Sequence, residues 1–284
     1  MKNVKFSGML RYEDLGFSLH RVTPARDYRP HTHDFHELEI ILSGSAINSI
    51  NGREFPIGPG DVFIVEKGAT HEISQIDGLT LYNLGFNGHA MRGIGNDLLK
   101  LPGFHALFRM EQPEDPTVRR LKLEPMELER AQALLDEMQE EYARAHPGFQ
   151  TVLLSGFAQL IVLLSRNYSR SMPERGTWQM AAALAKMERD YAEPLSIAAL
   201  ADSVCLSERH FRRQFEALYQ QTPKDYLRRL RLNAAAELLR KKELSVTEIA
   251  LACGFSDCNY FSRVFRQTVG ISPTQYRKRV VSLE

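Results

Sequence analysis

Three side chains near the start of the chain could together bind a metal ion or a polar small molecule. His31, His33 and Glu37 are separated by even numbers of residues, so on a β-strand all three project from the same face. Neutral imidazoles and a carboxylate are ligands that suit Zn, Fe, Mn or Ni. The same groups donate and accept hydrogen bonds, which a sugar needs in place of water. The spacing therefore predicts a polar site on one sheet face and leaves both ligand classes open.

A second candidate site is a basic helix face late in the chain. Arg209 and Arg213 are four residues apart, so they share one face of a helix. Phe211 and Phe215 share another face, which can point to a core. A guanidinium group offers two parallel donors to O6 and N7 of guanine. The spacing is typical of a helix that contacts base pairs, with a solvated helix surface as the alternative.

The elements that position the first site have the pattern of short β-strands. Apolar runs at residues 38–42 and 62–65 are bounded by turn sequences. These turn sequences are Asn51-Gly52, Gly58-Pro59-Gly60 and Lys67-Gly68. Asn-Gly between apolar runs strongly favours a tight hairpin. Many short strands at this spacing predict an all-β barrel or sandwich over about the first 90 residues.

The period of the apolar residues changes to that of helices from Glu124 onward. A narrow apolar stripe follows 3, 4, 3, 4 spacing and ends at residues 146–148; it consists of Leu128, Ala131, Leu135, Met138 and Tyr142. A second helix at residues 149–168 is apolar on most sides, so we expect it to be buried. Residues 171–176 have the composition of a linker.

The stripe also predicts self-association. Leu128, Leu135, Met138 and Tyr142 can bury only one side of their helix on a barrel, and three glutamates lie beside them. This pattern suits an antiparallel helix from a second copy of the chain. The alternative is that the stripe packs inside its own domain.

The last hundred residues contain one helix–turn–helix motif twice. The paired residues are Ser196 with Ser245, Ala201 with Ala250 and Ser207 with Ser256 at an offset of 49, and, after one inserted residue, Phe211 with Phe261, Arg213 with Arg263 and Phe215 with Phe265 at an offset of 50. The four serines are the predicted N-caps. Two such motifs in tandem are far more specific than one.

A long helix is predicted between the two motifs. Thr222 is its expected N-cap, Pro223 its first residue, and it should end near Lys241. Roughly 19 residues span about 28 Å. A rigid rod of that length can hold two helices in successive major grooves on one side of DNA, which are about 34 Å apart.

The distribution of charge agrees with a polyanionic partner for this half. The whole chain has a net charge of only +1, but residues 204–284 contain 15 Lys and Arg against 8 Asp and Glu. The three cysteines all follow residue 200, which excludes a disulfide framework. The sequence shows no secretory signal and no span suited to a bilayer, so we expect a cytoplasmic protein.

The second motif and the residues after it resemble a known family. The residues that carry the resemblance are Ile249-Ala250, Cys253-Gly254-Phe255, the run from Asn259 to Arg266, Gly270-Ile271-Ser272-Pro273 and Tyr276-Arg277. They are similar to the signature of the AraC/XylS family of bacterial transcription regulators. The resemblance implies an α+β chain with a cupin-like β-barrel at residues 1–120, a helical dimerisation segment at 121–172 and an all-α, seven-helix, double helix-turn-helix domain at 173–284.

The resemblance also implies which side chains contact DNA. In this family the side chains that contact bases lie near the starts of the two recognition helices. Here those positions are Arg209, Arg212 and Arg213 in the first helix, and Asp257, Asn259 and Arg263 in the second. Asn matches adenine and Asp accepts from cytosine. For Arg263 a phosphate or intradomain contact is favoured over a base contact.

His31, His33, Glu37 and His71 resemble the ligand set of a metal cupin, H-x-H-x-x-x-E followed by G-x-x-H. That resemblance keeps open a metal-dependent cupin enzyme, or a metal sensor, fused to the DNA-binding domain. Sugar-sensing members of the AraC/XylS family keep similar residues as structural or effector contacts. We therefore assign the four residues to effector binding and expect no catalytic residue, no cofactor and no metal.

The preferred function is an activator of transcription that responds to a small molecule. Residues 33–37, 101–104 and 255–259 are most similar to the branch of the family that regulates catabolism of L-rhamnose and related sugars. Tyr82 joins the four polar residues as an effector contact, since an aromatic ring can cover the apolar side of a deoxy sugar. The expected partners are double-stranded DNA, a sugar effector, RNA polymerase and a second copy of the chain, with no membrane.

Overall fold

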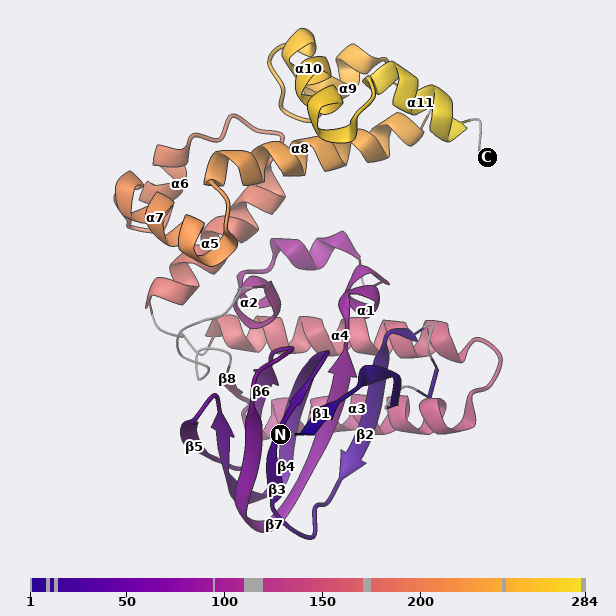
Figure 1. Cartoon of the computed structure of the whole chain (residues 1–284), viewed down its shortest axis with the longest axis vertical. Coiled ribbons are helices and arrows are strands. Elements are labelled where there is room, and N and C mark those ends of the chain that lie inside the picture. The colour runs from indigo at the N-terminus through magenta and orange to yellow at the C-terminus, as the bar shows by residue number, and fades with distance from the viewer. Residues whose placement is uncertain are drawn as a thin grey trace. The chain divides into compact units, whose positions relative to one another are not determined.

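The computed structural model describes residues 2–8, 11–12, 15–93, 95–109, 120–170, 175–241 and 244–281 (Figure 1). The chain divides into two compact units, Met1–Ala181 and Ala182–Glu284. The first is built on a β-sheet with helices, and the second is helical. This confirms the predicted α+β class. Of the predicted linker, residues 171–174 lie outside the described residues, whereas residues 175 and 176 begin a helix.

An eight-stranded sheet forms the centre of the N-terminal unit. Its strands are β1 (Lys2–Val4), β2 (Phe17–Val22), β3 (Tyr28–His33), β4 (His36–Ile50), β5 (Arg53–Ile57), β6 (Asp61–Val65), β7 (His71–Phe86) and β8 (Arg120–Lys122). The strand order is β1-β3-β7-β4-β6-β8, with β2 also paired to β7 and β5 to β4. Among the described residues this order has two ends, so the cupin-like domain contains an open sheet.

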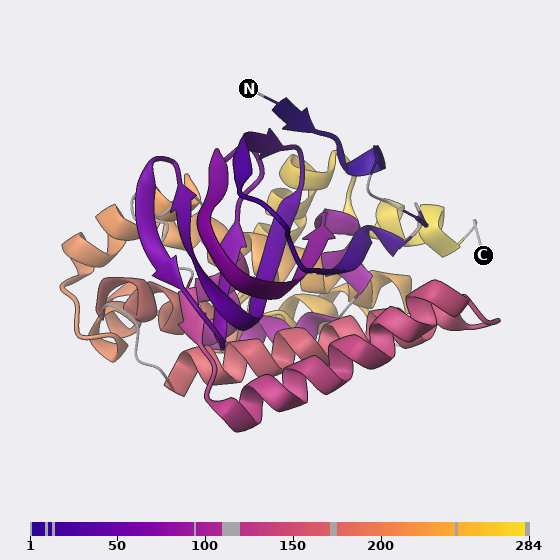
Figure 2. The same ribbon diagram turned by 90° about the horizontal axis from the view of Figure 1, so that it is seen from below.

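The helices of this unit lie between and after the strands. The short ones are η1 (Phe6–Gly8), α1 (Gly88–Gly93), η3 (Asn96–Lys100), α2 (Pro102–Phe104) and η4 (His105–Arg109). The long ones are α3 (Pro125–Arg144) and α4 (Phe149–Arg170), which confirm the two helices predicted from the apolar periods. Figure 2 shows α3 and α4 side by side along the sheet.

The turn between β4 and β5 confirms the predicted hairpin. Ile50 pairs with Arg53, so only two residues make the turn. These are Asn51 and Gly52, whose φ angles are +51° and +78°. A two-residue hairpin turn needs left-handed backbone at both positions, and Asn and Gly adopt it at least cost.

The two faces of the sheet have different environments because side chains alternate along each strand. On the helix-covered face, Phe17 stacks on Phe157 of α4 with ring centroids 5.2 Å apart. On the opposite face, which we call the inner face, Ile41, Phe63 and Leu81 belong to one buried apolar cluster. The sheet therefore has two buried faces, and a polar side chain on the inner face is enclosed by apolar neighbours.

The apolar stripe of α3 is used within its own unit. Leu135, Met138 and Tyr142 are buried in the isolated chain, and Leu128 is half-buried. A side chain at Gly156 of α4 would approach Met138 Cγ to 2.7 Å, so the two helices are in close contact there. The three buried residues form part of the intramolecular core and are not free to face a second chain. The predicted seam is thus covered within the unit, by α4 at Met138 and by Tyr12 at Tyr142.

Helix α4 contains residues Phe149–Tyr168, which are long and apolar enough to cross a membrane by length and composition. Leu153, Phe157 and Leu160 on this helix are fully buried in the N-terminal unit. Over this apolar stretch 39% is buried, so one side of the helix belongs to the core of the unit.

The C-terminal unit has the predicted arrangement of helices. The helices are the second half of α5 (Arg175–Asp190), which the boundary between the units divides after Ala181, and then α6 (Ile197–Ser203), α7 (Glu208–Tyr219), α8 (Pro223–Arg240), α9 (Val246–Ala252), α10 (Cys258–Val269) and α11 (Pro273–Val281). In Figure 1, α8 runs from the group of α6 and α7 to the group of α9, α10 and α11. The Thr222 side chain accepts a hydrogen bond from the Asp225 N–H, which confirms the predicted N-cap of α8.

The two motifs differ by one residue in their turns. α6 and α9 start 49 residues apart, whereas α7 and α10 start 50 apart. The N-cap of α10 is therefore Asp257, which accepts a hydrogen bond from the Tyr260 N–H, and the prediction of Ser256 was wrong. The inserted residue lies between Cys253 and Asp257, and it moves the cap one position along the chain.

Candidate functional site

Three of the predicted effector residues meet on the inner face of the sheet. His33 ends β3, Glu37 lies at the start of β4, and His71 opens β7. Glu37 Oε2 is 3.6 Å from His33 Nε2 and 3.3 Å from His71 Nε2. All three side chains are at most 5% exposed. His31 is half-buried beside them, with its ring centroid 4.2 Å from that of His71.

The hydrogen bonds of this group determine the tautomer of one ring. His33 Nδ1 is 2.6 Å from the carbonyl oxygen of Phe35, which can only accept a hydrogen bond. Nδ1 therefore carries the proton, and Nε2 of the neutral ring presents its lone pair to Glu37. Burial lowers the pKa of His33 and lowers that of His71 to about 2, so both rings are neutral at pH 7. Burial also raises the pKa of Glu37 to about 7.

A further set of polar side chains on the same face was missed by the sequence analysis. It consists of Ser18, Glu39, Asn48 and Asn83, of which all but the half-buried Asn83 are fully buried. The Asn83 amide donates to Glu39 Oε1 at 3.3 Å. Within the described residues, Ser18 Oγ, Glu39 Oε2, Asn83 Oδ1 and both amide atoms of Asn48 have no hydrogen-bond partner. Unpaired buried polar groups cost free energy, so this face is suited to a polar ligand.

A signal for one of these residues was present in the sequence. Glu39 is two residues after Glu37 and therefore shares its face of the strand. Burial and the nearby charge of Glu37 raise the pKa of Glu39 to about 8, so its carboxyl group is largely protonated at pH 7 and can donate as well as accept. Asn48 and Ser18 lie on strands whose register the sequence does not reveal.

Tyr82 does not belong to this group, which corrects the sequence-based assignment. Its neighbour Asn83 points to the inner face, so Tyr82 points to the helix-covered face. There its hydroxyl group donates a hydrogen bond to Asp136 of α3 at 2.6 Å. Tyr82 is fully buried and cannot contact a ligand bound between the histidines.

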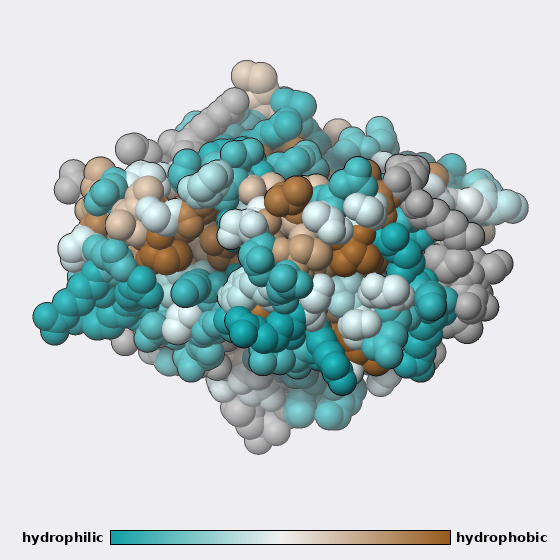
Figure 3. Space-filling model, turned by 90° about the horizontal axis from the view of Figure 1, so that it is seen from above, coloured by the Kyte–Doolittle hydropathy of each residue, from teal (hydrophilic) through white to brown (hydrophobic). Residues whose placement is uncertain are grey.

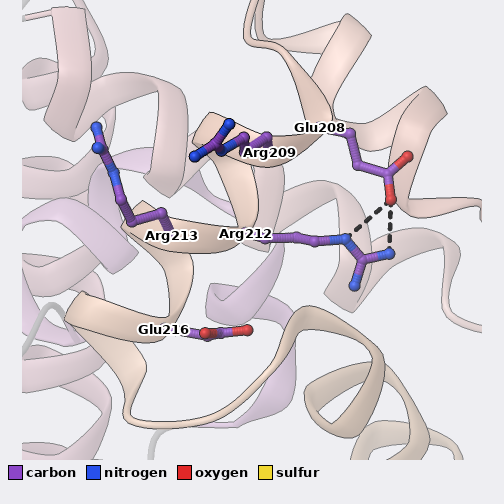
Figure 4. A pocket seen from close by; sticks show the side chains of 5 residues that line it. All are labelled: Glu208, Arg209, Arg212, Arg213 and Glu216. Atoms are coloured by element: carbon purple, nitrogen blue, oxygen red, sulfur yellow. Dashed lines mark hydrogen bonds and ion pairs between the residues drawn. The ribbon is translucent and has the colours of Figure 1, made fainter.

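The predicted DNA-contacting arginines of α7 lie at the surface around a shallow pocket (Figure 4). Arg209 and Arg213 are exposed. Arg212 is bound to Glu208 through two hydrogen bonds of 2.6 and 2.8 Å. Arg209 has no hydrogen-bond or ion-pair partner in the described part of the chain. Arg213 Nη2 is 3.4 Å from Nδ1 of His210. Of the three guanidinium groups, that of Arg209 is therefore the one without a partner among the described residues, while that of Arg212 is held by a carboxylate.

The corresponding residues of α10 are arranged in the same way. Asn259 lies in the first turn and is exposed, at the position that matches Arg209 in α7. Arg263 is exposed with its guanidinium over the ring of Tyr260, 5.5 Å from the centroid. Asp257 uses one carboxylate oxygen as the N-cap of α10. Its other oxygen, Oδ2, is not used by this cap.

The residues that hold these helices in place are apolar. Phe211 and Phe215 of α7 are fully buried, as predicted, and so are their repeat partners Phe261 and Phe265 of α10. Hydrophilic side chains cover most of the face in Figure 3, with apolar patches between them. On both α7 and α10, exposed polar side chains therefore lie on one side of the helix and buried phenylalanines on the other.

Comparisons with known proteins agree with both halves of the chain. The model of the AraC-like ligand-binding domain matches residues 15–160, and that of a helix-turn-helix domain matches residues 200–279. The HTH-type transcriptional activator RhaS from Escherichia coli O1:K1 is 32% identical over 257 residues, covering 90% of this chain and 89% of its own. RhaS from Escherichia coli O6:H1 is 33% identical over 257 residues, which again cover 90% of this chain and 89% of that protein.

A solved AraC-type regulator structure from Chromobacterium violaceum is 35% identical and covers 36% of this chain and 91% of its own, with a TM-score of 0.34. The ligand-binding model alone spans half of the chain, and the RhaS relatives align over nearly all of it. The chain therefore belongs to the AraC family of DNA-binding transcription regulators.

Proposed function

We propose that this protein activates transcription in response to a sugar that binds to the inner face of its N-terminal unit. The main support is a group of buried polar atoms without hydrogen-bond partners in the described residues, beside the histidine cluster. These atoms belong to Ser18, Glu39, Asn48 and Asn83. A sugar presents many hydroxyl groups, each of which needs both a donor and an acceptor after it leaves water. The apolar cluster around Ile41 and Phe63 supplies the less polar contacts.

The proposed effector is a 6-deoxyhexose such as L-rhamnose. A deoxy sugar combines hydroxyl groups with a methyl group, which matches a face that is polar at some positions and apolar at others. The similarity to activators named RhaS supports the same class of effector. Regulation of a promoter then requires RNA polymerase as a further partner, and the protein acts in the cytoplasm.

The effector is tested by thermal melting of the full chain with a panel of monosaccharides. Ligand binding stabilises the folded state by RT ln(1 + [L]/Kd), about 2.7 kcal/mol at a hundredfold excess over Kd. We expect L-rhamnose to raise the melting temperature by several degrees. Asn48→Ala, which removes two unpaired atoms from the inner face, should abolish that shift, whereas Lys67→Ala in an exposed turn should retain it. A shift with an aromatic or amino acid, and none with any sugar, would contradict the proposal.

We propose that DNA is bound by the exposed polar faces of α7 and α10. The side chains are Arg209, Arg212 and Arg213 on α7, and Asp257, Asn259 and Arg263 at α10. Most of these side chains are exposed, and several occupy matching positions in the two motifs, which the continuous helix α8 joins. These two observations support the proposal. α8 has 18 residues, so the two motifs are about 27 Å apart along its axis. Fluorescence anisotropy with promoter duplexes tests this, and salt-independent binding would contradict it.

We also propose that the protein is a homodimer, with the outer side of α4 at the interface. Val152 on α4 is 53% exposed, and Val162 and Leu163 are only partly buried in the single chain. An apolar helix face that its own unit leaves uncovered suits a second copy of the same helix.

A further inference from the structure

We infer that the cleft between the two helix-turn-helix motifs binds a small organic anion with an apolar body. The cleft has a volume of about 450 Å³. Binding sites for small molecules measure about 300–1,000 Å³, so this size suits such a ligand. All of its lining residues belong to the C-terminal unit, whereas the proposed sugar site lies in the N-terminal unit. The inferred ligand is therefore a second one, and its binding does not depend on the sugar.

Three segments of the chain line this cleft. The base is one face of α8, where the lining residues follow the spacing i, i+3, i+4 and i+7. One side is the start of α6, and the other is the turn before α10 with one residue of that helix. In this order the lining residues are Lys224, Leu227, Arg228 and Arg231, then Leu195, Ser196 and Ile197, then Gly254, Phe255, Ser256 and Tyr260.

The two sides of the cleft come from different motifs and meet at one end. A Cβ at Gly254, in the turn of the second motif, would lie 2.6 Å from the carbonyl oxygen of Ala192, which precedes the first motif. The backbones are therefore in close contact at this point, while the space along α8 stays open. A ligand in the cleft contacts both motifs at once.

The charged side chains that line the cleft are all cations. Among the described residues around it, Lys224, Arg228 and Arg231 carry charge and no carboxylate does. Arg228 is paired with Asp225. Lys224 is exposed and has no hydrogen-bond or ion-pair partner in the described part of the chain. The charge of the cleft is thus complementary to an anion.

Arg231 is held by acceptors that do not neutralise it. Its Nε and Nη2 donate to the carbonyl oxygens of Tyr191 and Glu193 at 2.7 and 2.9 Å, and these bonds fix the loop before α6 on α8. No carboxylate of the described residues pairs with this guanidinium. Burial lowers the pKa of Arg231, because the half-buried cation has lost part of its hydration. An anion beside it replaces the lost interaction with water.

The apolar side chains favour an organic anion over the DNA backbone. Leu195, Ile197 and Leu227 line the cleft together with Phe255 and Tyr260. A phosphodiester group has no apolar surface to bury against them. An organic carboxylate gains free energy both from its charge and from the burial of its hydrocarbon part. The lining therefore suits a ligand that combines one negative charge with an apolar body.

The test is isothermal titration calorimetry of the full chain with 2-naphthoate as the probe. We expect saturable binding of one naphthoate per chain. The neutral analogue 2-naphthylmethanol lacks the charge and inorganic phosphate lacks the apolar body, so both should bind more weakly. Saturating L-rhamnose should leave the binding of naphthoate unchanged, because the two sites lie in different units.

The matched variants are Lys224→Glu and Arg229→Glu, which make the same change of charge on the same helix. Lys224 lines the cleft, whereas Arg229 is exposed outside it with its guanidinium over the ring of Tyr226. Lys224→Glu should weaken the binding of naphthoate about tenfold, since the reversed charge repels the carboxylate. Arg229→Glu should retain the affinity of the wild type. Both residues lie on the surface of α8, and circular dichroism shows that the helices have formed.

Three outcomes would overturn the inference. The first is the absence of saturable binding by the wild type, and the second is equal affinity of the two variants. The third is inorganic phosphate binding as tightly as naphthoate, which would assign the cleft to the DNA backbone. Each of them leaves the sugar-induced melting shift as a separate measurement of the proposed function.

Discussion

Tyr82 and Asp136 join the central strand of the sheet to α3 through a 2.6 Å hydrogen bond between the phenol and a carboxylate oxygen. Asp136 is also 3.4 Å from the Arg21 guanidinium of β2. Burial, then the bond to Asp136, raises the pKa of Tyr82, so the phenol stays protonated and acts as the donor. One carboxylate therefore fastens α3 to two strands of the sheet.

The first prediction is that Tyr82→Phe destabilises the N-terminal unit without changing its ligand. Loss of this hydrogen bond to a carboxylate that is 42% exposed should cost about 1–1.5 kcal/mol in urea unfolding. Because Tyr82 lies on the helix-covered face, the affinity for sugar should stay within about twofold. A variant of normal stability that has lost sugar binding would show that Tyr82 contacts the effector after all.

The second prediction concerns recognition of DNA. Arg209→Ala and Arg213→Ala should each cost roughly 1–3 kcal/mol for the specific site and relax the preference for one base pair. Arg212→Ala should cost less, because Arg212 is already bonded to Glu208. Lys241→Ala should weaken all duplexes alike and lower the salt dependence. Competition anisotropy at several salt concentrations measures these effects. Lys67→Ala in the N-terminal unit makes the same change of charge and is the control.

The third prediction compares two glycines with left-handed backbone. Gly254 has φ +79°, and a Cβ there would lie 2.6 Å from the carbonyl oxygen of Ala192. Gly270 has φ +87° with no atom within 4 Å of its Cβ position. Gly270→Ala should therefore cost only the backbone strain, about 1–2 kcal/mol. Gly254→Ala adds a clash with backbone and should cost clearly more. Equal melting temperatures for the two variants would contradict this.

The fourth prediction is a pH dependence at the start of α9. The Glu248 carboxylate accepts a hydrogen bond from the Ser245 N–H, and this bond holds its pKa below the ordinary value. A lowered pKa in the folded state means that the stabilisation is present above the unfolded value, 4.5, and is lost as the pH falls through the folded value.

Hydrogen exchange of the α9 amides measures this effect. Glu248→Gln should speed exchange at pH 7, and the difference from the wild type should shrink as the pH falls below 4.5 and the carboxylate takes up a proton. Ser245→Ala removes the other half of the capping box and should cost about 1 kcal/mol at both pH values. An effect of Glu248→Gln that is equally large at pH 3 would show that the charge is not responsible.

The fifth prediction concerns the dimer. Val152→Asp places a charge on the outer side of α4 and should turn a dimer into a monomer in sedimentation velocity. Met126→Asp, at a residue of α3 that is 70% exposed, should leave the dimer intact. Leu135→Asp should unfold the N-terminal unit, since Leu135 is buried within it. A wild type that sediments as a monomer, or a dimeric Val152→Asp, would contradict the assigned surface.

Local patterns in the sequence were enough to predict much of the fold. The Asn51-Gly52 turn and the Thr222-Pro223 start of α8 depend on backbone preferences of the residues themselves, and both were confirmed. The cap of α10 was displaced because one inserted residue can be placed at more than one point of a repeat. Only the turn geometry distinguishes Ser256 from Asp257.

Features that depend on distant parts of the chain could not be derived in this way. The apolar stripe of α3 predicts that one side of this helix is buried, but it does not say against which element. The close approach of Gly156 to Met138 identifies α4 as an element that covers it. Tyr82 was misassigned because it was chosen as an aromatic ring suited to a deoxy sugar, without the strand register that decides which face of the sheet it lies on. Once the strand is known to be continuous, its alternation places Tyr82 opposite the inner face.

Helix α8 sets an angle as well as a length. Each residue of an α-helix advances the chain by about 1.5 Å and rotates it by roughly 100°. One residue added to α8 would turn the second motif by slightly more than a quarter of a turn about the helix axis. The rotation is nearly restored only after about seven residues, with an extension of roughly 10 Å. The distance between the two motifs can therefore change only in large steps if their relative orientation is kept, and the 18 residues of α8 specify one spacing together with one rotational phase.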